Sequence, residues 1–322
     1  MTQKTVVLLT NLGTPDDLSK KSVRRFLREF LSDGRVVEIP SLIWWFILNM
    51  LILPFRAGKS LKAYKSIWTD QGSPLLQISK QQQQSLQKKL GSNTNVALAM
   101  RYGNPSLGVA LKSVMKESVE KLIVLPLYPQ NSATTTATTF DHLAQTLRPY
   151  RNLPEIHFIN GYFANPGYIN SLAGSVSEHW KQQGRQRFLL MSFHGLPQNF
   201  VEKGDPYYDQ CMTTGDLLAT ILGLSSEQWR LSFQSRFGKA KWIKPYTSEV
   251  LINMAQNGLK EIDVICPGFS ADCLETLEEI CIENQAFFLQ NGGEQYFYIK
   301  ALNNREEHIQ MMEDLVKPYL SS

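Results

Sequence analysis

The sequence of 322 residues has few cysteines, and their spacing is not that of a metal site. The four are Cys211, Cys266, Cys273 and Cys281, and no two of them form a C-x-x-C pair. Isolated thiols are typically buried and unmodified in a reducing compartment. We therefore expect free cysteines, with neither a disulfide framework nor an iron–sulfur site.

Concentrated charge is also missing. The chain has 33 Lys and Arg against 29 Asp and Glu, for a net charge of +4, and the two signs are interspersed. Proteins that bind nucleic acid gather their basic residues on one face. There is no G-x-G-x-x-G, and the GKS at 58–60 follows Leu53 where a P-loop requires glycine. We expect no DNA or RNA partner and no nucleotide site.

No secretory signal is recognisable at the amino terminus. MTQKTVVLLTNLGTPDD has one early lysine, enters a short β-like segment at once and then reaches acidic residues. A signal peptide has a longer apolar stretch and a cleavage site of small residues. The pattern predicts a mature amino terminus and a cytoplasmic location.

One segment, 39–55, is strongly apolar: IPSLIWWFILNMLILPF. It is interrupted by Ser41 and Asn49, and it is shorter than the roughly 20 apolar residues that a spanning helix needs. Two interpretations stay open. The segment is either a core helix buried on all sides, or an apolar lip that borders a cleft for a greasy ligand or rests on the inner face of the cytoplasmic membrane.

Short apolar runs alternate with helical patterns along the chain, as in parallel sheets with crossover helices. In SVRRFLREFL, from Ser22, the apolar residues fall on one face of a helix. The pattern predicts an α/β protein. The candidate strands are TVVLL from Thr5, VALAM from Val96, KLIVLPLY from Lys121, EIHFIN from Glu155, RFLLMSF from Arg187, WRLSFQ from Trp229, EIDVIC from Glu261 and QYFYIK from Gln295.

The second half of the chain repeats the strand ends of the first half in the same order. LLTNLGTP (8–15) corresponds to LMSFHGLP (190–197), AMRYGNP (99–105) to FQSRFGKA (233–240), and VLPLYPQNSATTT (124–136) to VICPGFSADCLET (264–276). We infer two similar doubly wound, Rossmann-like domains, each with a mainly four-stranded parallel sheet. The first spans 1–160, includes the apolar lip and is joined by a carboxyl-terminal helix (303–322); the second spans 161–302.

His194 ends the first strand of the second half. Ligands of open parallel sheets bind beyond the carboxyl ends of the strands, where the strand order reverses. In a 2-1-3-4 order, the first and third strands flank that point. Glu275 follows the third strand and could therefore reach His194, where the imidazole and the carboxylate could accept protons or hold a divalent metal. A partly buried histidine and an acid that interacts with a helix dipole remain the structural alternative.

Several motifs together resemble those of the ferrochelatase family, which inserts ferrous iron into a porphyrin. They are LLTNLGTPD, QGSPL, VLPLYPQ, SFHGLPQNFVEKGDPY, FQSRFGKAKWIKPYT and CPGFSADCLETLEE. The resemblance extends from Thr5 to about Met312 and is strongest to the proteobacterial form. It implies a chelatase-like fold with an active cleft between the two domains, and protoporphyrin IX and Fe²⁺ as substrates.

The resemblance also implies roles for single residues. His194 and Glu275 match the family's active-site pair, interpreted either as iron ligands or as the route for pyrrole protons. Cleft residues that contact the substrate are expected at Arg56, Arg101, Tyr102 and Trp242, and we add Leu12 of LLTNLGTP. Cys273 stands where some relatives have a second histidine. The sequence ends LVKPYLSS without the cysteine-bearing extension of some relatives, so no [2Fe-2S] cluster and no tightly bound cofactor are expected.

Two other functions stay open. Coproporphyrin III or another tetrapyrrole could be the substrate of the same fold. A bilobal porphyrin carrier without catalysis would need no proton acceptor, so replacement of His194 would leave it functional.

Overall fold

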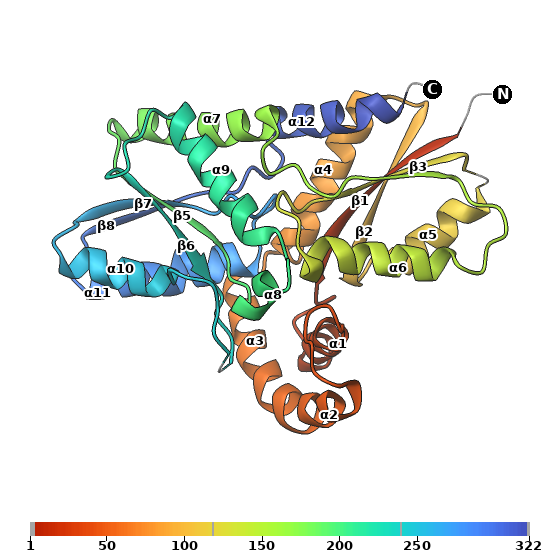
Figure 1. The fold of residues 1–322 in the computed structure, drawn as a ribbon, viewed down its shortest axis with the longest axis horizontal. Helices are drawn as coiled ribbons and strands as arrows, with labels where there is room; N and C mark the ends of the chain where they lie inside the picture. Colours follow the sequence, from red (N-terminus) through yellow and green to blue (C-terminus); the bar gives the residue numbers. More distant parts are fainter. Residues whose placement is uncertain (1–3, 118, 239, 321–322) are drawn as a thin grey trace. The chain divides into compact units, whose positions relative to one another are not determined.

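The computed structural model describes residues 4–117, 119–238 and 240–320. The chain forms two compact units. The first comprises Met1–Tyr128, Ser132–Gly161 and Ile309–Ser322, and the second comprises Pro129–Asn131 and Tyr162–His308. Figure 1 traces the chain through both.

The first unit is built on a parallel sheet in the strand order β2-β1-β3-β4. β1 lies between its two neighbours, with Leu8 opposite Ala97 of β2 and Val124 of β3. The central strands β1 and β3 are buried almost throughout and contain the apolar runs VVLL and LIVLP, as is typical of a sheet covered on both faces. The elements are β1 (Thr5–Thr14), α1 (Lys20–Leu31), α2 (Ser41–Phe46), the π-helical turn η1 (Ile47–Ile52), α3 (Leu53–Ile67), α4 (Pro74–Leu90), β2 (Thr94–Gly103), α5 (Leu107–Lys116), β3 (Lys121–Pro126), the π-helical turn η2 (Ala133–Ala137), α6 (Thr138–Leu147), β4 (Glu155–Phe158), most of α12 (Glu306–Val316) and the 3₁₀ turn η4 (Lys317–Tyr319).

The second unit repeats this plan with the strand order β6-β5-β7-β8, again parallel. Its central strand β5 is buried from Leu189 to Phe193. The elements are α7 (Pro166–Gln183), β5 (Phe188–His194), α8 (Gln198–Glu202), α9 (Tyr207–Ile221), β6 (Trp229–Gln234), α10 (Thr247–Gln256), β7 (Glu261–Ile265), the π-helix η3 (Glu275–Asn284), α11 (Gln285–Gln290) and β8 (Gln295–Ile299).

These sheets confirm the predicted fold: two α/β units with four parallel strands each and the 2-1-3-4 order. All eight predicted strands are present. The π-helical segments were not predicted, because the i to i+5 hydrogen bonds of a π-helix depend on tertiary context more than on apolar periodicity.

The structure contradicts one of the two interpretations of the apolar segment 39–55, the core helix that is buried on all sides. Leu48 and Leu53 are buried, whereas Leu42 and Phe55 expose 72% and 79% of their surface, so the segment is not a core helix covered on all sides. The argument that this segment is too short to span a membrane also fails, because the helix extends beyond residue 55. The helix continues from Ser41 to Ile67, 27 residues in all, and 18 consecutive residues of it have a mean hydropathy of 1.4. Among the described residues it alone has the length and composition to cross a membrane.

Candidate active site

His194 lies at the carboxyl end of β5, next to the point where the order of the second sheet reverses. It pairs with Gln234 of β6, while β5 has β7 on its other side. The imidazole is half-buried, and its Nδ1 lies 2.6 Å from the carbonyl oxygen of Gly195. A carbonyl oxygen only accepts hydrogen bonds, so Nδ1 carries the proton in the neutral ring. The other nitrogen, Nε2, therefore has the free lone pair.

Gly195 is required by close packing beside this histidine. Its N–H donates to the Gln234 carbonyl oxygen at 2.7 Å. A Cβ on residue 195 would lie 2.6 Å from that oxygen and 3.1 Å from Cε3 of Trp242. The ring of Trp242 thus lies against Gly195, and its Nε1 donates to the Phe237 carbonyl oxygen at 2.8 Å. Of the predicted substrate contacts, Trp242 is the one that the structure places next to His194.

Glu275 begins the π-helix η3 after β7, and Glu279 follows one turn later. Both side chains are half-buried. Gln234 links the helix to β6, since its Nε2 donates to the Glu275 carbonyl oxygen at 2.8 Å and to Glu279 Oε2 at 3.4 Å. The strand end that carries the partner of His194 therefore also holds the first turn of the π-helix.

Ser235 completes this connection. Its N–H donates to Glu279 Oε1 at 2.6 Å, and its hydroxyl donates to Glu279 Oε2. The backbone of Ser235 has a φ of 63°, an unusual value for a residue other than glycine. Such strain persists only where the surrounding contacts hold it, and here they fix the carboxylate.

The electrostatics join the three ionisable groups. Burial raises the pKa of Glu279, partly offset by the Ser235 hydrogen bonds and the charge of His194, while the charge of Glu275 raises the pKa further. Glu279 therefore interacts electrostatically with both His194 and Glu275. The sequence offered one indication of this role for Glu279: its i, i+4 spacing from Glu275, which places the two side chains on one face of a helix.

Cys273 lies beside Glu275 with its side chain buried. Burial raises the pKa of the thiol well above its usual value, and a hydrogen bond to Glu275 raises it further. The group is therefore a neutral S–H donor to the carboxylate. Within the described residues, no group of three or more His, Cys, Asp or Glu side chains could hold a metal ion.

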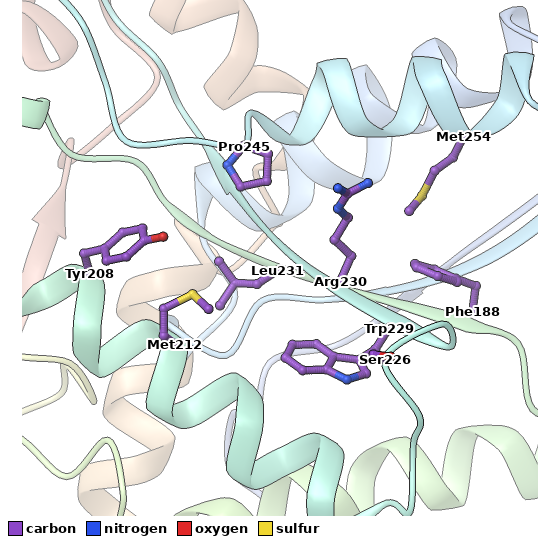
Figure 2. A pocket seen from close by; sticks show the side chains of 9 residues that line it. All are labelled: Phe188, Tyr208, Met212, Ser226, Trp229, Arg230, Leu231, Pro245 and Met254. Atoms are coloured by element: carbon purple, nitrogen blue, oxygen red, sulfur yellow. The ribbon is translucent and has the colours of Figure 1, made fainter.

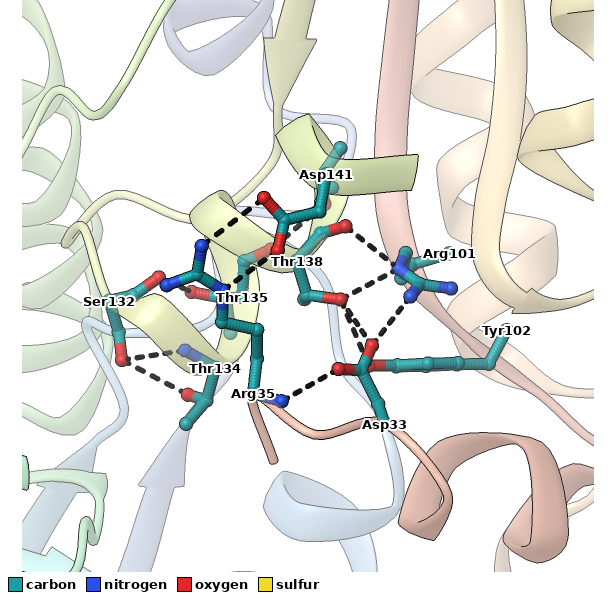
Figure 3. A network of polar contacts seen from close by, with 10 residues as sticks. Asp33, Arg35, Arg101, Tyr102, Ser132, Thr134, Thr135, Thr138 and Asp141 are labelled. Carbon is teal, nitrogen blue, oxygen red and sulfur yellow. Dashed lines mark hydrogen bonds and ion pairs between the residues drawn. The ribbon is translucent and has the colours of Figure 1, made fainter. Parts of the chain in front are cut away.

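The other predicted contacts lie in the first unit, where Figure 3 shows a polar network. Arg101 Nη2 lies 2.5 Å from Asp33 Oδ2, and its Nε donates to Thr138 Oγ1 at 2.9 Å. The hydroxyls of Tyr102 and Thr138 also donate to Asp33 Oδ2. Burial alone would raise the pKa of Asp33, but the hydrogen bonds from Thr138, the Arg35 N–H and Tyr102, with the charge of Arg101, lower it.

In this structure, the residues predicted to contact substrate in the first unit are buried or half-buried. Tyr102 has no exposed surface and offers its ring to no ligand in this conformation. Arg101 is mostly buried and paired with Asp33. Arg56, on α3, is half-buried, and burial lowers its pKa. Leu12, near the end of β1, is half-buried. Substrate contact by these four residues stays a prediction.

Comparison with known proteins gives the family. The family model described as ferrochelatase matches residues 4–320. A ferrochelatase of Aeromonas hydrophila is 49% identical over 98% of this chain and 98% of its own length. Ferrochelatase 2 of Shewanella oneidensis is also 49% identical with the same coverages, and a ferrochelatase of Methylococcus capsulatus is 47% identical over 99% of this chain and 97% of its own length.

Solved structures agree in fold. SirB from Bacillus subtilis, solved with Fe³⁺, matches with a TM-score of 0.56 at 10% identity, over 99% of this chain and 96% of SirB. CbiX, the terminal enzyme of sirohaem biosynthesis in denitrifying bacteria, matches with a TM-score of 0.54 at 12% identity, over 99% of this chain and all of CbiX. Because the family model matches nearly the whole chain and these ferrochelatases are 47–49% identical over nearly their whole length, the chain belongs to the ferrochelatase family.

Proposed function

We propose that this ferrochelatase inserts Fe²⁺ into protoporphyrin IX to give protohaem, with His194 as the first acceptor of the two pyrrole protons. The observation that carries the proposal is the hydrogen bond from His194 Nδ1 to the Gly195 carbonyl oxygen. It leaves Nε2 as the proton acceptor. The ordinary pKa of imidazole, about 6.5, suits acceptance and release of protons near neutral pH.

The acidic residues of the π-helix then carry the protons onward. Protonation of Nε2 places a positive charge next to the carboxylates of Glu275 and Glu279, which stabilise it. The raised pKa of Glu279 brings this carboxyl closer to neutrality, which favours transient protonation. Each porphyrin nitrogen that loses its proton gains a bond to iron, so the two N–H protons are replaced by one divalent cation.

Iron must also be held before transfer. The imidazole and carboxylate groups of His194 and Glu275 are suitable ligands for Fe²⁺, and so few ligands bind weakly enough to release the ion. Because one nitrogen cannot hold a proton and a metal at once, the two roles of His194 follow each other. The half-buried ring of Trp242 offers an apolar surface next to this histidine. We propose that it packs against the macrocycle and helps to hold it bent.

The test is replacement of His194 by Ala in the full-length protein. We expect no detectable haem formation from protoporphyrin IX and Fe²⁺ under anaerobic conditions, while porphyrin fluorescence still reports binding. His157→Ala is the matched control, since this histidine contacts Glu155 on the strand β4 and should be dispensable. Turnover of His194→Ala close to that of the control would contradict the proposal. Porphyrin binding without haem formation in the control and in the parent protein would instead indicate a porphyrin carrier.

We propose that no resident cofactor takes part. Cys211, Cys266 and Cys273 are buried, and burial raises the pKa of each thiol, which disfavours the thiolate that an iron–sulfur cluster requires. Iron and acid-labile sulfide in the purified protein should both be far below one equivalent. A stoichiometric amount of each would show that a cluster is present.

We also propose a cytoplasmic protein that binds peripherally to the inner face of the membrane through the apolar lip. The lip presents large exposed apolar side chains, at Ile39, Leu42, Ile43, Trp45, Phe46, Met50, Leu51 and Phe55. A helix with one apolar face can lie in the interface of a bilayer without crossing it.

A further inference from the structure

A cavity lies in the second unit (Figure 2), and its lining does not include His194, Glu275 or Trp242. Its volume is about 460 Å³, within the range of small-molecule sites. It surrounds the amino-terminal half of the edge strand β6, whereas the partner of His194 on that strand, Gln234, is at the opposite end. The lining residues are Phe188, Tyr208, Met212, Ser226, Trp229, Arg230, Leu231, Pro245 and Met254.

The edge of β6 supplies unpaired hydrogen-bond donors to this cavity. The Gln228 and Gln234 carbonyl oxygens accept from β5 and from Gly195, so the even-numbered residues face the sheet. The Phe233 N–H points the other way and donates to the Pro245 carbonyl oxygen at 2.8 Å. Because the ladder alternates, the N–H groups of Trp229 and Leu231 point outward like that of Phe233. Neither N–H donates to another backbone carbonyl among the described residues outside the β5 ladder, so both can donate to a ligand.

The walls are aromatic and sulfur-bearing. Figure 2 shows Tyr208 and Met212 of α9 beside Trp229 and Leu231, with Met254 of α10 near Arg230 and Phe188. The thioether side chains are flexible and adapt to flat apolar molecules. The lining therefore favours a flat, apolar body in contact with the Trp229 ring.

Arg230 adds a positive charge at the rim. Its side chain is exposed, and no carboxylate among the described residues forms an ion pair with it. A guanidinium group and outward backbone N–H groups are the donors that bind a carboxylate. These donors are on the same three residues of β6.

From this arrangement we infer that the β6 cavity is a binding site for a small carboxylate with a flat, apolar ring system. The carboxylate lies between Arg230 and the Leu231 N–H, and the ring system contacts Trp229 and Met212. The site is separate from that of iron insertion, and its occupancy does not require His194.

The test uses the full-length protein labelled with ¹³C at the methionine methyl groups, titrated with 2-naphthoate. We expect saturable shifts of the Met212 and Met254 signals, assigned through Met212→Leu and Met254→Leu. Met50, exposed on the apolar lip, reports non-specific binding and should shift little. The uncharged analogue 2-naphthamide should bind more weakly.

Arg230→Gln keeps the length of the side chain and removes its charge. We expect a Kd for 2-naphthoate about two- to fivefold higher, as for loss of one exposed ion pair. Arg148→Gln, at an exposed arginine of the first unit, is the control and should leave the Kd unchanged. The inference is wrong if the pocket methionines do not shift saturably, if Met50 shifts as much as they do, or if Arg230→Gln binds like the control.

Discussion

At the scale of single residues, Gly195 sets the position of the proposed proton acceptor. A methyl group at this position would lie 2.6 Å from a backbone oxygen of β6, so the backbone next to His194 must move. We expect Gly195→Ala to lower kcat for haem formation at least about tenfold and to destabilise the protein by about 1–3 kcal/mol. Anaerobic turnover and urea unfolding measure the two effects.

The control for this variant is Gly174→Ala on α7, where an added methyl group meets nothing within 4 Å. Alanine favours a helix over glycine by up to about 1 kcal/mol, so this variant should be as stable as the parent or more so. Equal activities of the two alanine variants would show that the close approach at Gly195 does not position the histidine.

Glu279 and Asp33 should affect stability with opposite dependences on pH. Burial raises the pKa of Glu279 in the folded state, so its ionisation on going to neutral pH costs stability. Hydrogen bonds and Arg101 lower the pKa of Asp33 against the effect of burial, so its contribution is present at neutral pH and is lost as the pH falls through the lowered pKa.

Urea unfolding between about pH 2 and pH 7.5 measures both effects, because the loss at Asp33 falls below its ordinary pKa of 3.8 and the cost at Glu279 begins above its ordinary pKa of 4.5. The stability of Glu279→Gln relative to the parent should increase as the pH rises, because the variant has no buried carboxyl group to ionise. The stability of Asp33→Asn relative to the parent should decrease over the same rise. Parallel behaviour of the two variants would rule out the opposite shifts.

The sequence indicated part of this site. His194 and Glu275 could be singled out because each follows a recognisable apolar strand on either side of the expected switch point. Gln234 and Ser235 could not, since their role depends on the strained backbone of Ser235 and on contacts between residues more than 40 positions apart. Tyr102 shows the opposite limit. Its motif predicted a residue of the cleft, but nothing in the sequence indicated that the tyrosine ring is fully buried.

At the scale of elements, strands were predictable and π-helices were not. Each central strand contains a short, mainly apolar run, as is typical of a sheet covered on both faces. The segment SADCLETLEE reads as an ordinary helix, whereas the structure has a π-helix from Glu275 to Asn284. The contacts of Glu279 with Ser235 and of Gln234 with the Glu275 carbonyl hold its first turn, and no local propensity encodes them.

The apolar lip gives a prediction at this scale. Leu42→Ser and Phe55→Ser change exposed side chains, so each should alter the free energy of unfolding by less than about 0.5 kcal/mol. Together they should weaken binding to vesicles of anionic phospholipid at least about tenfold, because apolar area that would enter the interface is lost. Vesicle flotation measures the binding.

Leu48→Ser is the contrasting variant, because Leu48 is buried and its loss should destabilise the fold by several kcal/mol, about 2–5 for such a truncation. If the double variant at the exposed positions floats with vesicles as the parent does, the lip does not contact membranes.

At the scale of the whole molecule, the two units share a plan but not a chemistry. In the repeated segments Gly13 aligns with Gly195, and an added methyl group at either would collide with a backbone oxygen of the neighbouring strand, Tyr102 or Gln234. A π-helical segment follows the third strand in both units. However, Leu12 occupies the position of His194, and Thr135 that of Glu275, so only the second unit has the pair proposed to accept protons.

The number of cationic side chains available to bind propionates affects which porphyrin the enzyme prefers. Protoporphyrin IX has two propionates, whereas coproporphyrin III has four and needs more cationic partners. The net charge of the chain is only +4, and one of the two arginines proposed to contact substrate, Arg101, is already paired with Asp33. Large apolar side chains are exposed on the lip instead. Each additional carboxylate that is buried without a partner costs at least about 1 kcal/mol.

We therefore expect kcat/KM for Fe²⁺ insertion to be at least about tenfold higher with protoporphyrin IX than with coproporphyrin III, a difference of about 1.4 kcal/mol. Both porphyrins should be assayed side by side, anaerobically and in the same detergent, by the appearance of the haem spectrum. Asp33→Asn removes the ion pair of Arg101. If this arginine can reach a propionate, the variant should have a smaller ratio of kcat/KM between protoporphyrin IX and coproporphyrin III. A preference for coproporphyrin III in the parent protein would overturn the assignment of substrate but leave the roles of His194 and Glu275 intact, since both macrocycles must lose the same two protons.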